Sequence, residues 1–437
     1  MLSQREKKQL FVLAFACFAV RLFAAFFIHA ELASDAADYV QIAYNIMQGK
    51  GFSLDGHLTS YRPPAYPFFL AGILSIFPTL QAAIIAQAVF ETITAVSLFF
   101  IGKNIFSVRT GFLAMLFWTF FPASFLQVPF LFSEPMFTAI IMGSFALLLR
   151  QQNYKLSLFL VIGILWGIAV LIKPQSIVIP VLYFGWLTVR KEPRLPLLKK
   201  SAATLAGIIL LLSPWIVRNM EEFNQPIIVS NGGVNFWIGN NEHATGGYYF
   251  PAENNPLANV RSEIERSDLG YALGIQFIMH HPLRAVYLSG MKLAYLFSLE
   301  SPLAISLTTN GNLYKKSFSA KYRETPLPLL AGINMPYMIF LLVGIYGFVR
   351  MPMHRSTMHL FLLAFVIGWA MVHIPFFGIS RYHYPLLPIF AVSSAYAVAE
   401  RNEIKNNLTA QRKIIAGASA LFLVMVWIGE IVTVYVR

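Results

Sequence analysis

Asp35 and Asp38 follow the first long apolar run of the chain, within the stretch LASDAADYVQIAYN (residues 32–45). The apolar residues after them recur at three- and four-residue spacing. This spacing predicts a short amphipathic helix that begins after Ser34 and ends near Gly49. In that helix Asp38 lies at the edge of the apolar stripe, where an acid of the first turn is common. Asp35 lies within the stripe and needs a partner or a catalytic purpose, and the pattern alone leaves both interpretations open.

Arg62 precedes Pro63 and Pro64 in the stretch TSYRPPAYPFFLAG (residues 59–72). The two prolines fix an extended, rigid backbone, so no helix absorbs the arginine. A guanidinium held in this way can bind two oxygens of one phosphate group. An arginine that binds lipid head groups would have the same pattern.

The composition of the 437-residue chain predicts an all-α polytopic membrane protein. Hydrophobic residues make up 57% and charged residues 12%, and the charged fraction is about half that of soluble proteins. Apolar runs long enough to cross a bilayer recur along the whole chain. We expect eleven spans, within a range of 11–13, near residues 10–30, 80–101, 111–131, 135–149, 156–172, 174–189, 200–217, 327–349, 358–377, 382–399 and 414–435.

The net charge of +13 is concentrated in the short segments on the side of the amino terminus. This asymmetry follows the positive-inside rule, so we expect a cytoplasmic amino terminus and membrane lipids, and no nucleic acid, as partners. The chain is predicted to form a single integral membrane domain (1–437). Its first outer, periplasmic loop spans 31–79 and carries the amphipathic interfacial helices.

A second, mixed outer loop is predicted over residues 218–326. Its stretch SNGGVNFWIGNNEHATGGYYFPAENNP has the Asn, Gly and aromatic content of turns and short strands. A helix is expected around 258–280. The modest apolar run 282–307 contains two basic residues, so we expect it to lie along the interface or to re-enter the membrane.

Charged side chains gather near the outer ends of the predicted spans. Each by itself could anchor a span at the interface, and Glu134, next to Pro135, could simply begin a helix. Together they form a charged ring that suits a lipid-linked anion: Asp35, Asp38, Arg62, Glu134, Lys173, Arg218 and Arg381. Three neighbours are predicted to line the same cavity: Asn219, Tyr382 and His383.

Arg21 and Glu91 lie near the middle of two predicted spans, where a lone charge is costly. Because they are opposite in sign and similar in depth, we predict a structural ion pair between neighbouring helices. Cys17 is the single cysteine, and the pair His280–His281 lacks a spaced acidic or histidine partner. No metal site is therefore predicted.

The order and spacing of several motifs resemble the bacterial glycosyltransferases of the GT-C superfamily, in the group similar to protein O-mannosyltransferases and the lipid A aminoarabinose transferase. The motifs are SDAADYVQIAYNIMQGKGF, YRPPAYPFFLAG, FLFSEPMF, PWIVRN, SNGGVNFWIGNN with TGG, HHPLRA and RYHYPLLP, between residues 34 and 388. The resemblance implies a membrane-helical GT-C fold with an active site in an outer cavity. It also implies a sugar donor linked to a polyprenyl phosphate.

The resemblance assigns roles to individual residues. The family's D-x-x-x-Y pattern begins at Asp35, which makes it the catalytic base, and Asp38 is a weaker candidate. Arg62 would hold the donor phosphate, and Glu134 corresponds to a second acid. Two further residues match cavity-facing family positions and are expected to bind the donor phosphate: Arg218 and Arg381.

Transfer from a lipid phosphate needs a base at the acceptor hydroxyl and fixed positive charge at the leaving phosphate. We therefore expect an inverting transferase that moves a hexose or pentose to a hydroxyl group of a glycan, lipid or protein. The transfer is expected at the outer face of the bacterial inner membrane. Two arginines replace a divalent metal, so no cofactor is expected. The alternatives are a transporter or flippase of lipid-linked sugars and a glycan polymerase that uses diphosphate-linked donors.

Overall fold

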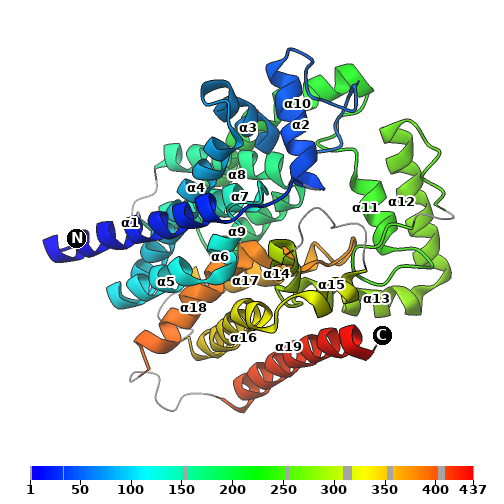
Figure 1. Ribbon diagram of the computed structural model, residues 1–437. Coiled ribbons are helices and arrows are strands. Elements are labelled where there is room, and N and C mark those ends of the chain that lie inside the picture. The colour runs from blue at the N-terminus through cyan, green and yellow to red at the C-terminus, as the bar shows by residue number, and fades with distance from the viewer. Residues whose placement is uncertain are drawn as a thin grey trace.

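The computed structural model describes residues 2–32, 34–150, 155–251, 255–308, 317–351, 358–401 and 409–436. Nearly all regular structure in these residues is helical, as predicted. Figure 1 shows the helices packed into one bundle, with the amino terminus and the carboxyl terminus at opposite ends.

The helices of the first half include most of the long apolar segments. In chain order they are α1 (Gln4–Phe27), α2 (Asp35–Met47), α3 (Ala65–Ile76), α4 (Leu80–Ile105), α5 (Val108–Phe120), α6 (Pro122–Leu126), α7 (Glu134–Arg150), α8 (Leu156–Ile172), the 3-10 helix η1 (Pro174–Ile177), α9 (Val178–Val189) and α10 (Arg194–Phe223). Strands β1 (Ser53–Leu54) and β2 (His57–Leu58) pair antiparallel and form the one sheet in the described part of the chain.

The second half contains the long outer loop and the last apolar helices. Its elements are α11 (Gly232–Gly239), α12 (Glu263–His280), α13 (Pro282–Leu296), α14 (Ser301–Thr308), α15 (Phe318–Glu324), α16 (Leu327–Arg350), α17 (Met358–Met371), the 3-10 helix η2 (Ser380–Leu386), α18 (Leu387–Ala399) and α19 (Ala410–Val436).

A helix occupies each of the eleven predicted span ranges. Five helices of the described residues are long and apolar enough to cross a membrane: α1, α4, α10, α16 and α19. Several shorter apolar helices lie among them. The chain is therefore a multi-pass membrane protein, whereas the number of crossings stays a prediction. Three of the short segments expected on the side of the amino terminus, 150–155, 350–357 and 400–413, lie partly outside the described residues.

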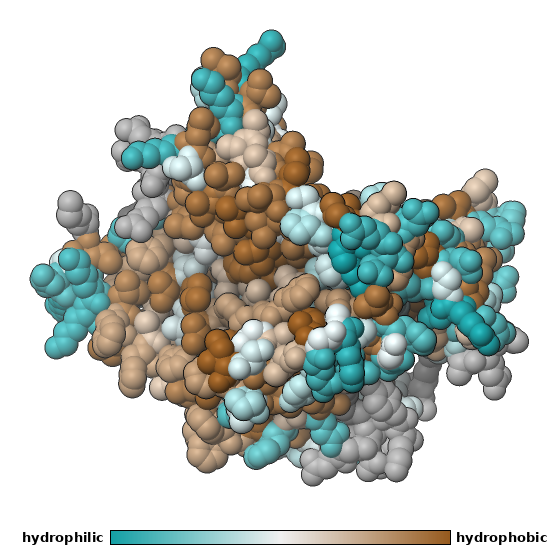
Figure 2. Space-filling model, turned by 90° about the horizontal axis from the view of Figure 1, so that it is seen from above, coloured by the Kyte–Doolittle hydropathy of each residue, from teal (hydrophilic) through white to brown (hydrophobic). Residues whose placement is uncertain are grey.

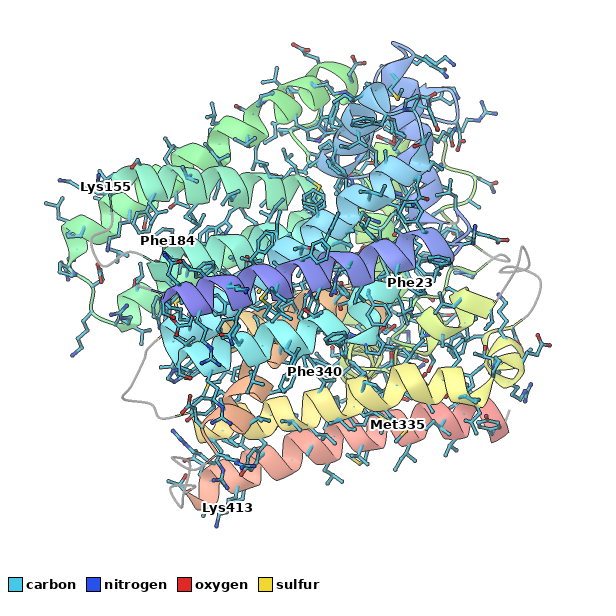
Figure 3. The ribbon with its side chains drawn as sticks, turned by 60° about the vertical axis from the view of Figure 1, so that its left-hand side comes forward. Phe23, Lys155, Phe184, Met335, Phe340 and Lys413 are labelled. Atoms are coloured by element: carbon cyan, nitrogen blue, oxygen red, sulfur yellow. The ribbon has the colours of Figure 1, made fainter. Side chains whose placement is uncertain are left out.

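The outermost long helices present apolar side chains outward. Phe23 of α1 is 62% exposed and Met335 of α16 is 57% exposed, and Figure 3 shows these two helices at the outside of the bundle. The face in Figure 2 is largely hydrophobic, with hydrophilic patches toward its edges. Such a surface requires an apolar solvent, which the lipid bilayer provides.

The amphipathic helix predicted in the first outer loop is α2. Its buried face includes Tyr39, Ile42 and Ala43 and packs against α3. Ser34 occupies the N-cap position, as predicted, but its φ of 53° turns the hydroxyl away from the helix amides. The Ser34 hydroxyl instead donates a hydrogen bond of 3.4 Å to Oδ1 of Asp35.

The described residues of the long outer loop form helices joined by turns and irregular segments and contain no strand, so the predicted turns are present and the predicted short strands are wrong. The helix expected around 258–280 is α12, and α11 packs against it. A Cβ on Gly233 would lie 1.7 Å from the carbonyl oxygen of Ser267. The glycine therefore permits close helix packing and does not mark a turn. The run 282–307 forms α13 and α14, neither of which is long enough to span.

Arg21 and Glu91 are both buried, but no ion pair joins them among the described residues, so the predicted pair is corrected. Arg21 donates to the carbonyl oxygens of Trp118 and Thr119, each at 2.8 Å. Glu91 accepts from the indole of Trp118 at 2.9 Å and from the Tyr384 hydroxyl at 2.7 Å. Trp118 therefore links the two residues, since its carbonyl oxygen binds Arg21 and its indole binds Glu91. Each charged side chain is bound by neighbouring polar groups, so it does not need the opposite charge.

Candidate active site

The amino-terminal end of α2 is held by an arginine from the following loop. Arg62 Nη1 lies 2.8 Å from Oδ1 of Asp35. Arg62 Nη2 lies 2.7 Å from Oδ2 of Asp38, and its Nε donates to the same oxygen at 2.8 Å. Both aspartates are thus bound by one guanidinium. The side chains of Asp35 and Arg62 are 18% and 17% exposed, so solvent screens this contact only partly.

Arg381 of η2 extends the network to two more acids. Its Nη2 pairs with Oδ2 of Asp35, and its Nε lies 3.3 Å from Oε1 of Glu134. Lys173, which follows α8, donates to the same oxygen of Glu134 at 2.9 Å. Three acidic and three cationic side chains therefore alternate through space in the order Asp38, Arg62, Asp35, Arg381, Glu134 and Lys173.

Local sequence explains how five separate segments reach this point. Glu134 begins α7 next to Pro135, and Lys173 ends α8 before the proline that starts η1. Arg62 lies in a short non-helical segment before α3, and the N-cap residue Pro64 has helical backbone angles, so the predicted extended backbone does not continue through Pro64. Each of these charges lies at a helix end, where the backbone leaves the bundle, so charged groups can meet without crossing the apolar interior.

The network keeps Asp35 ionised. Burial opposes its charge, but Arg381 and Arg62 outweigh that effect and hold the pKa of Asp35 well below its usual range. Burial likewise works against the charge of both arginines, and Asp35 with the neighbouring acids raises the pKa of each guanidinium. An unpaired charge at this degree of burial would be costly, so the pairs are mutually dependent.

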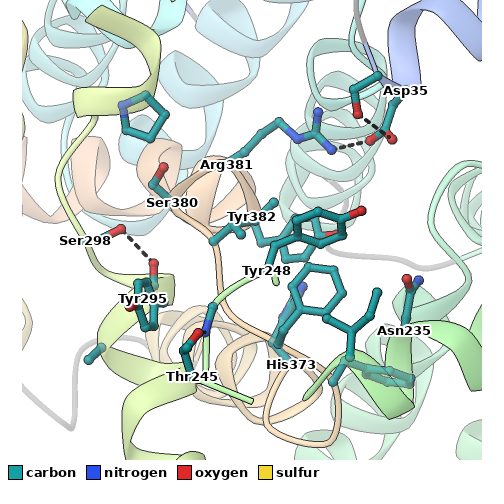
Figure 4. A pocket seen from close by; sticks show the side chains of 18 of the residues that line it. Asp35, Asn235, Thr245, Tyr248, Tyr295, Ser298, His373, Ser380, Arg381 and Tyr382 are labelled. Carbon is teal, nitrogen blue, oxygen red and sulfur yellow. Dashed lines mark hydrogen bonds and ion pairs between the residues drawn. The ribbon is translucent and has the colours of Figure 1, made fainter. Parts of the chain in front are cut away.

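Four members of the network line a cavity of about 1490 Å³: Asp35, Arg62, Lys173 and Arg381. Asp38 and Glu134 are not among the lining residues. Figure 4 shows Asp35 and Arg381 joined on the cavity wall, with Tyr382 nearby. Another part of the wall is apolar and comes from α19, including Phe422, Met425 and Val426.

The remaining predicted residues lie outside the cavity lining, except Tyr382, which lines it. Arg218 donates to the carbonyl oxygens of Thr59 and Phe52 at 2.9 and 3.3 Å, so it secures the first outer loop. Asn219 accepts from Arg218 and donates to Ile227. Arg218 therefore binds a different set of partners from Arg62 and Arg381.

His383 is buried behind the cavity wall, where it contacts Glu300, a residue that lines the cavity. Its Nε2 lies 2.8 Å from Oε1 of Glu300, and its Nδ1 lies 2.7 Å from the carbonyl oxygen of Leu296. Glu300 lines the cavity together with Glu430, whose carboxylate accepts from the amide of Leu299. Sequence reasoning missed both glutamates, because an acid in an apolar stretch shows no partner until the helices are packed.

Glu263 is a further residue that the sequence analysis did not select. Its Oε1 accepts from the amide and the hydroxyl of Ser60 at 2.7 and 2.8 Å, and its Oε2 accepts from the Thr59 hydroxyl at 2.7 Å. The long outer loop thus fixes the backbone directly before Arg62. In the sequence, Ser262 is followed three residues later by an acid, a pattern that indicates the start of a helix. This pattern does not identify the partners of Glu263.

We expect Glu263→Gln to loosen the segment that carries Arg62. An amide nitrogen cannot accept a hydrogen bond, so at least one of the three bonds is lost, at about 1 kcal/mol each. Hydrogen–deuterium exchange of residues 53–64 should become faster. Glu265→Gln, on the exposed side of the same turn, is the matched control. Unchanged exchange in Glu263→Gln would contradict this positioning role.

The acidic side chains of the network, Asp35, Asp38 and Glu134, all have cationic partners. The described residues contain no group of three histidine, cysteine, aspartate or glutamate side chains that could hold an ion. Arg62 and Arg381 place fixed positive charge on the cavity wall.

Comparison with known proteins gives one family match and several structural matches. Residues 61–217 match the family model described as dolichyl-phosphate-mannose-protein mannosyltransferase. The archaeal oligosaccharyltransferase AglB from Archaeoglobus fulgidus, in complex with an inhibitory peptide and a dolichol-phosphate, is 15% identical with a TM-score of 0.52. The alignment covers 97% of this chain and 55% of AglB. No curated protein sequence matches the chain.

Two further structures are similar. The Archaeoglobus fulgidus oligosaccharyltransferase in complex with Zn and sulfate is 14% identical, with a TM-score of 0.53 over 96% of this chain and 52% of that one. ArnT from Cupriavidus metallidurans, bound to undecaprenyl phosphate, is 14% identical, with a TM-score of 0.45 over 90% of this chain and 79% of ArnT.

The chain shares its fold with the oligosaccharyltransferase AglB, in agreement with the GT-C fold that the sequence motifs imply. The family match extends over about a third of the chain, and the chain spans about half the length of AglB.

Proposed function

We propose that this protein is an inverting glycosyltransferase that moves a monosaccharide from a polyprenyl-phosphate donor to an acceptor hydroxyl. The observation that carries the proposal is the position of Asp35 between Arg62 and Arg381 on the wall of one large cavity. A carboxylate and two guanidinium groups supply the base and the positive charge that this reaction needs. The dolichol-phosphate held by AglB agrees with a lipid phosphate as the carrier.

In the proposed reaction the donor phosphate competes with Asp35 for the two arginines. Binding of the phosphate would draw positive charge away from the carboxylate and so increase its basicity. Asp35 then accepts the proton of the acceptor hydroxyl while that oxygen attacks the anomeric carbon. The bond from the anomeric carbon to the phosphate oxygen breaks, and Arg62 and Arg381 stabilise the charge on the released lipid phosphate.

The cavity also suits the lipid part of such a donor. Phe422, Met425 and Val426 of α19 form an apolar wall in the same cavity as the charged network. We propose that the polyprenyl chain lies against this wall. The concentration of positive charge near the amino-terminal side supports an active site that faces the periplasm of a bacterial inner membrane, with a glycan, lipid or protein as the acceptor.

Reconstitution in lipid nanodiscs tests the proposed function. The purified protein is supplied with undecaprenyl phosphates that carry different hexoses or pentoses, and with diphosphate-linked and nucleotide-linked sugars as controls. We expect transfer, or hydrolysis to the free sugar with inversion, only from a monophosphate carrier. In proteoliposomes, movement of an intact donor across the bilayer without any transfer would support a flippase and contradict the proposal.

Transfer is expected to continue in the presence of a metal chelator. The arginines provide fixed charge at the leaving phosphate, so no divalent ion is needed for the chemical step. The rate with excess EDTA should remain within about twofold of the untreated rate, because no metal–phosphate interaction is lost. Loss of transfer that only Mg²⁺ or Mn²⁺ restores would contradict this expectation.

A further inference from the structure

His373 follows α17 and lines the cavity with only 4% of its surface exposed. Its Nδ1 lies 2.7 Å from the carbonyl oxygen of Trp369. A carbonyl oxygen only accepts hydrogen bonds, so Nδ1 carries the proton, and in the neutral ring Nε2 is an acceptor. The backbone of α17 therefore selects one tautomer of His373.

The Nε2 atom of His373 is buried and has no hydrogen-bond partner among the described residues. A buried acceptor without a donor is destabilising, and native proteins rarely keep one without a reason. The side chain is also not needed in the charge network, because Asp35 and Glu134 already have cationic partners. Because His373 lines the cavity, a ligand that brings a donor, such as a hydroxyl group, can satisfy this acceptor.

A row of aromatic rings begins beside His373 and continues along the cavity. The ring of Tyr382 lies 5.0 Å from His373 and 5.8 Å from Phe377, and Phe377 lies 5.3 Å from Tyr248, measured between ring centroids. All four side chains line the cavity, and Figure 4 shows Tyr248, Tyr382 and His373 together. Flat apolar faces beside a few polar atoms suit a sugar ring, which has apolar C–H faces and hydroxyl edges.

This aromatic group adjoins the charged network. Tyr382 follows Arg381 directly in the chain, and Lys173 Nζ lies 5.7 Å from the centre of the Tyr382 ring. In a sugar phosphate, the sugar ring is attached directly to the phosphate. A phosphate bound by Arg381 would therefore bring its sugar to the rings beside Tyr382.

We propose that Tyr382, Phe377, Tyr248 and His373 form the subsite for the donor sugar, and that Nε2 of His373 accepts a hydrogen bond from one of its hydroxyl groups. This inference rests on the proposed function, because it takes a sugar phosphate as the ligand. His373 binds and orients the sugar in this arrangement and takes no proton from it.

Two substitutions separate the two ring nitrogens. In His373→Asn the amide nitrogen can replace Nδ1 toward Trp369, but nothing replaces Nε2. In His373→Gln the longer side chain can place a carbonyl oxygen near the position of Nε2. The binding probes are undecaprenyl phosphate without a sugar and a panel of undecaprenyl phosphates that carry single hexoses or pentoses, all measured in nanodiscs.

We expect the wild-type protein to bind at least one sugar-bearing carrier more tightly than the bare carrier. His373→Asn should reduce that preference by roughly tenfold, the size of one lost hydrogen bond, while its affinity for the bare carrier stays the same. His373→Gln should keep the preference within about threefold. The unchanged affinity for the bare carrier distinguishes loss of a sugar contact from damage to the fold.

Two results would overturn the subsite without touching the proposed function: a wild type that binds every carrier equally with or without sugar, and a His373→Asn variant that keeps the full preference. A wild-type protein that binds neither form of undecaprenyl phosphate would instead refute the proposed function, and the subsite with it.

Discussion

Asp35→Asn is expected to lower sugar transfer by roughly 10²–10⁴-fold, the usual contribution of a positioned general base. The amide has the same shape and still reaches the two arginines with its oxygen, but it does not accept the proton of the acceptor hydroxyl. Binding of undecaprenyl phosphate should persist. Transfer and carrier binding are measured on the same nanodisc preparation.

The geometry also predicts that Asp35→Asn folds. Arg62 keeps its contacts with Asp38, and Arg381 keeps Glu134, so neither guanidinium loses all of its acids. Asp55→Asn is a matched control, because Asp55 is exposed in the same loop and its φ of 50° is one that asparagine tolerates. Full transfer by Asp35→Asn would remove Asp35 from the role of base.

The depressed pKa of Asp35 adds a statement about pH. A carboxyl group whose pKa is lower in the folded than in the unfolded state stabilises the fold above its unfolded pKa of about 3.9. That stability is lost as the pH falls through the lower folded value. The free protein therefore holds Asp35 ionised throughout the neutral range, and loss of kcat/KM between pH 5 and 7 would have to come from another group.

Arg381→Gln is expected to weaken binding of undecaprenyl phosphate by about 10- to 100-fold, as loss of a charge-assisted hydrogen bond implies. Among the described residues, Arg381 is the one side chain that pairs with both Asp35 and Glu134, and it lies on the cavity wall. Its removal leaves Asp35 with Arg62 and Glu134 with Lys173, so each acid keeps a cation. The loss should therefore affect the carrier more than the fold.

Arg381→Lys distinguishes charge from geometry. Lysine keeps the positive charge but cannot reach two acids with a planar fork, so we expect an intermediate affinity. Lys50→Gln removes an exposed cation from the first outer loop and serves as the control for net charge. Carrier affinity in Arg381→Gln equal to that of the control would contradict a phosphate-binding role, and a thermal midpoint far below wild type would show that the effect is structural.

Arg218 illustrates what the motifs alone did not resolve. The sequence placed three arginines in the charged ring on the outer side, and nothing in their spacing distinguished their partners. In the structure Arg62 and Arg381 meet at Asp35, whereas Arg218 donates to carbonyl oxygens of the first outer loop. The choice among them depends on which helix ends meet, and helix packing across distant parts of the chain decides that.

Local patterns in the sequence were sufficient to predict the individual helices. Apolar runs of membrane length predicted the helices, and the apolar spacing after Asp35 predicted α2, because a helix face is a property of neighbouring residues. Tertiary structure decided the partners. Arg21 binds the carbonyl oxygen of Trp118, and Glu91 binds its indole. Glu263 fixes the backbone before Arg62. His373 lines the same cavity as Asp35, although the two residues are 338 positions apart in the chain. A buried polar atom takes the nearest group that folding brings within hydrogen-bond distance, and that distance is absent from the linear sequence.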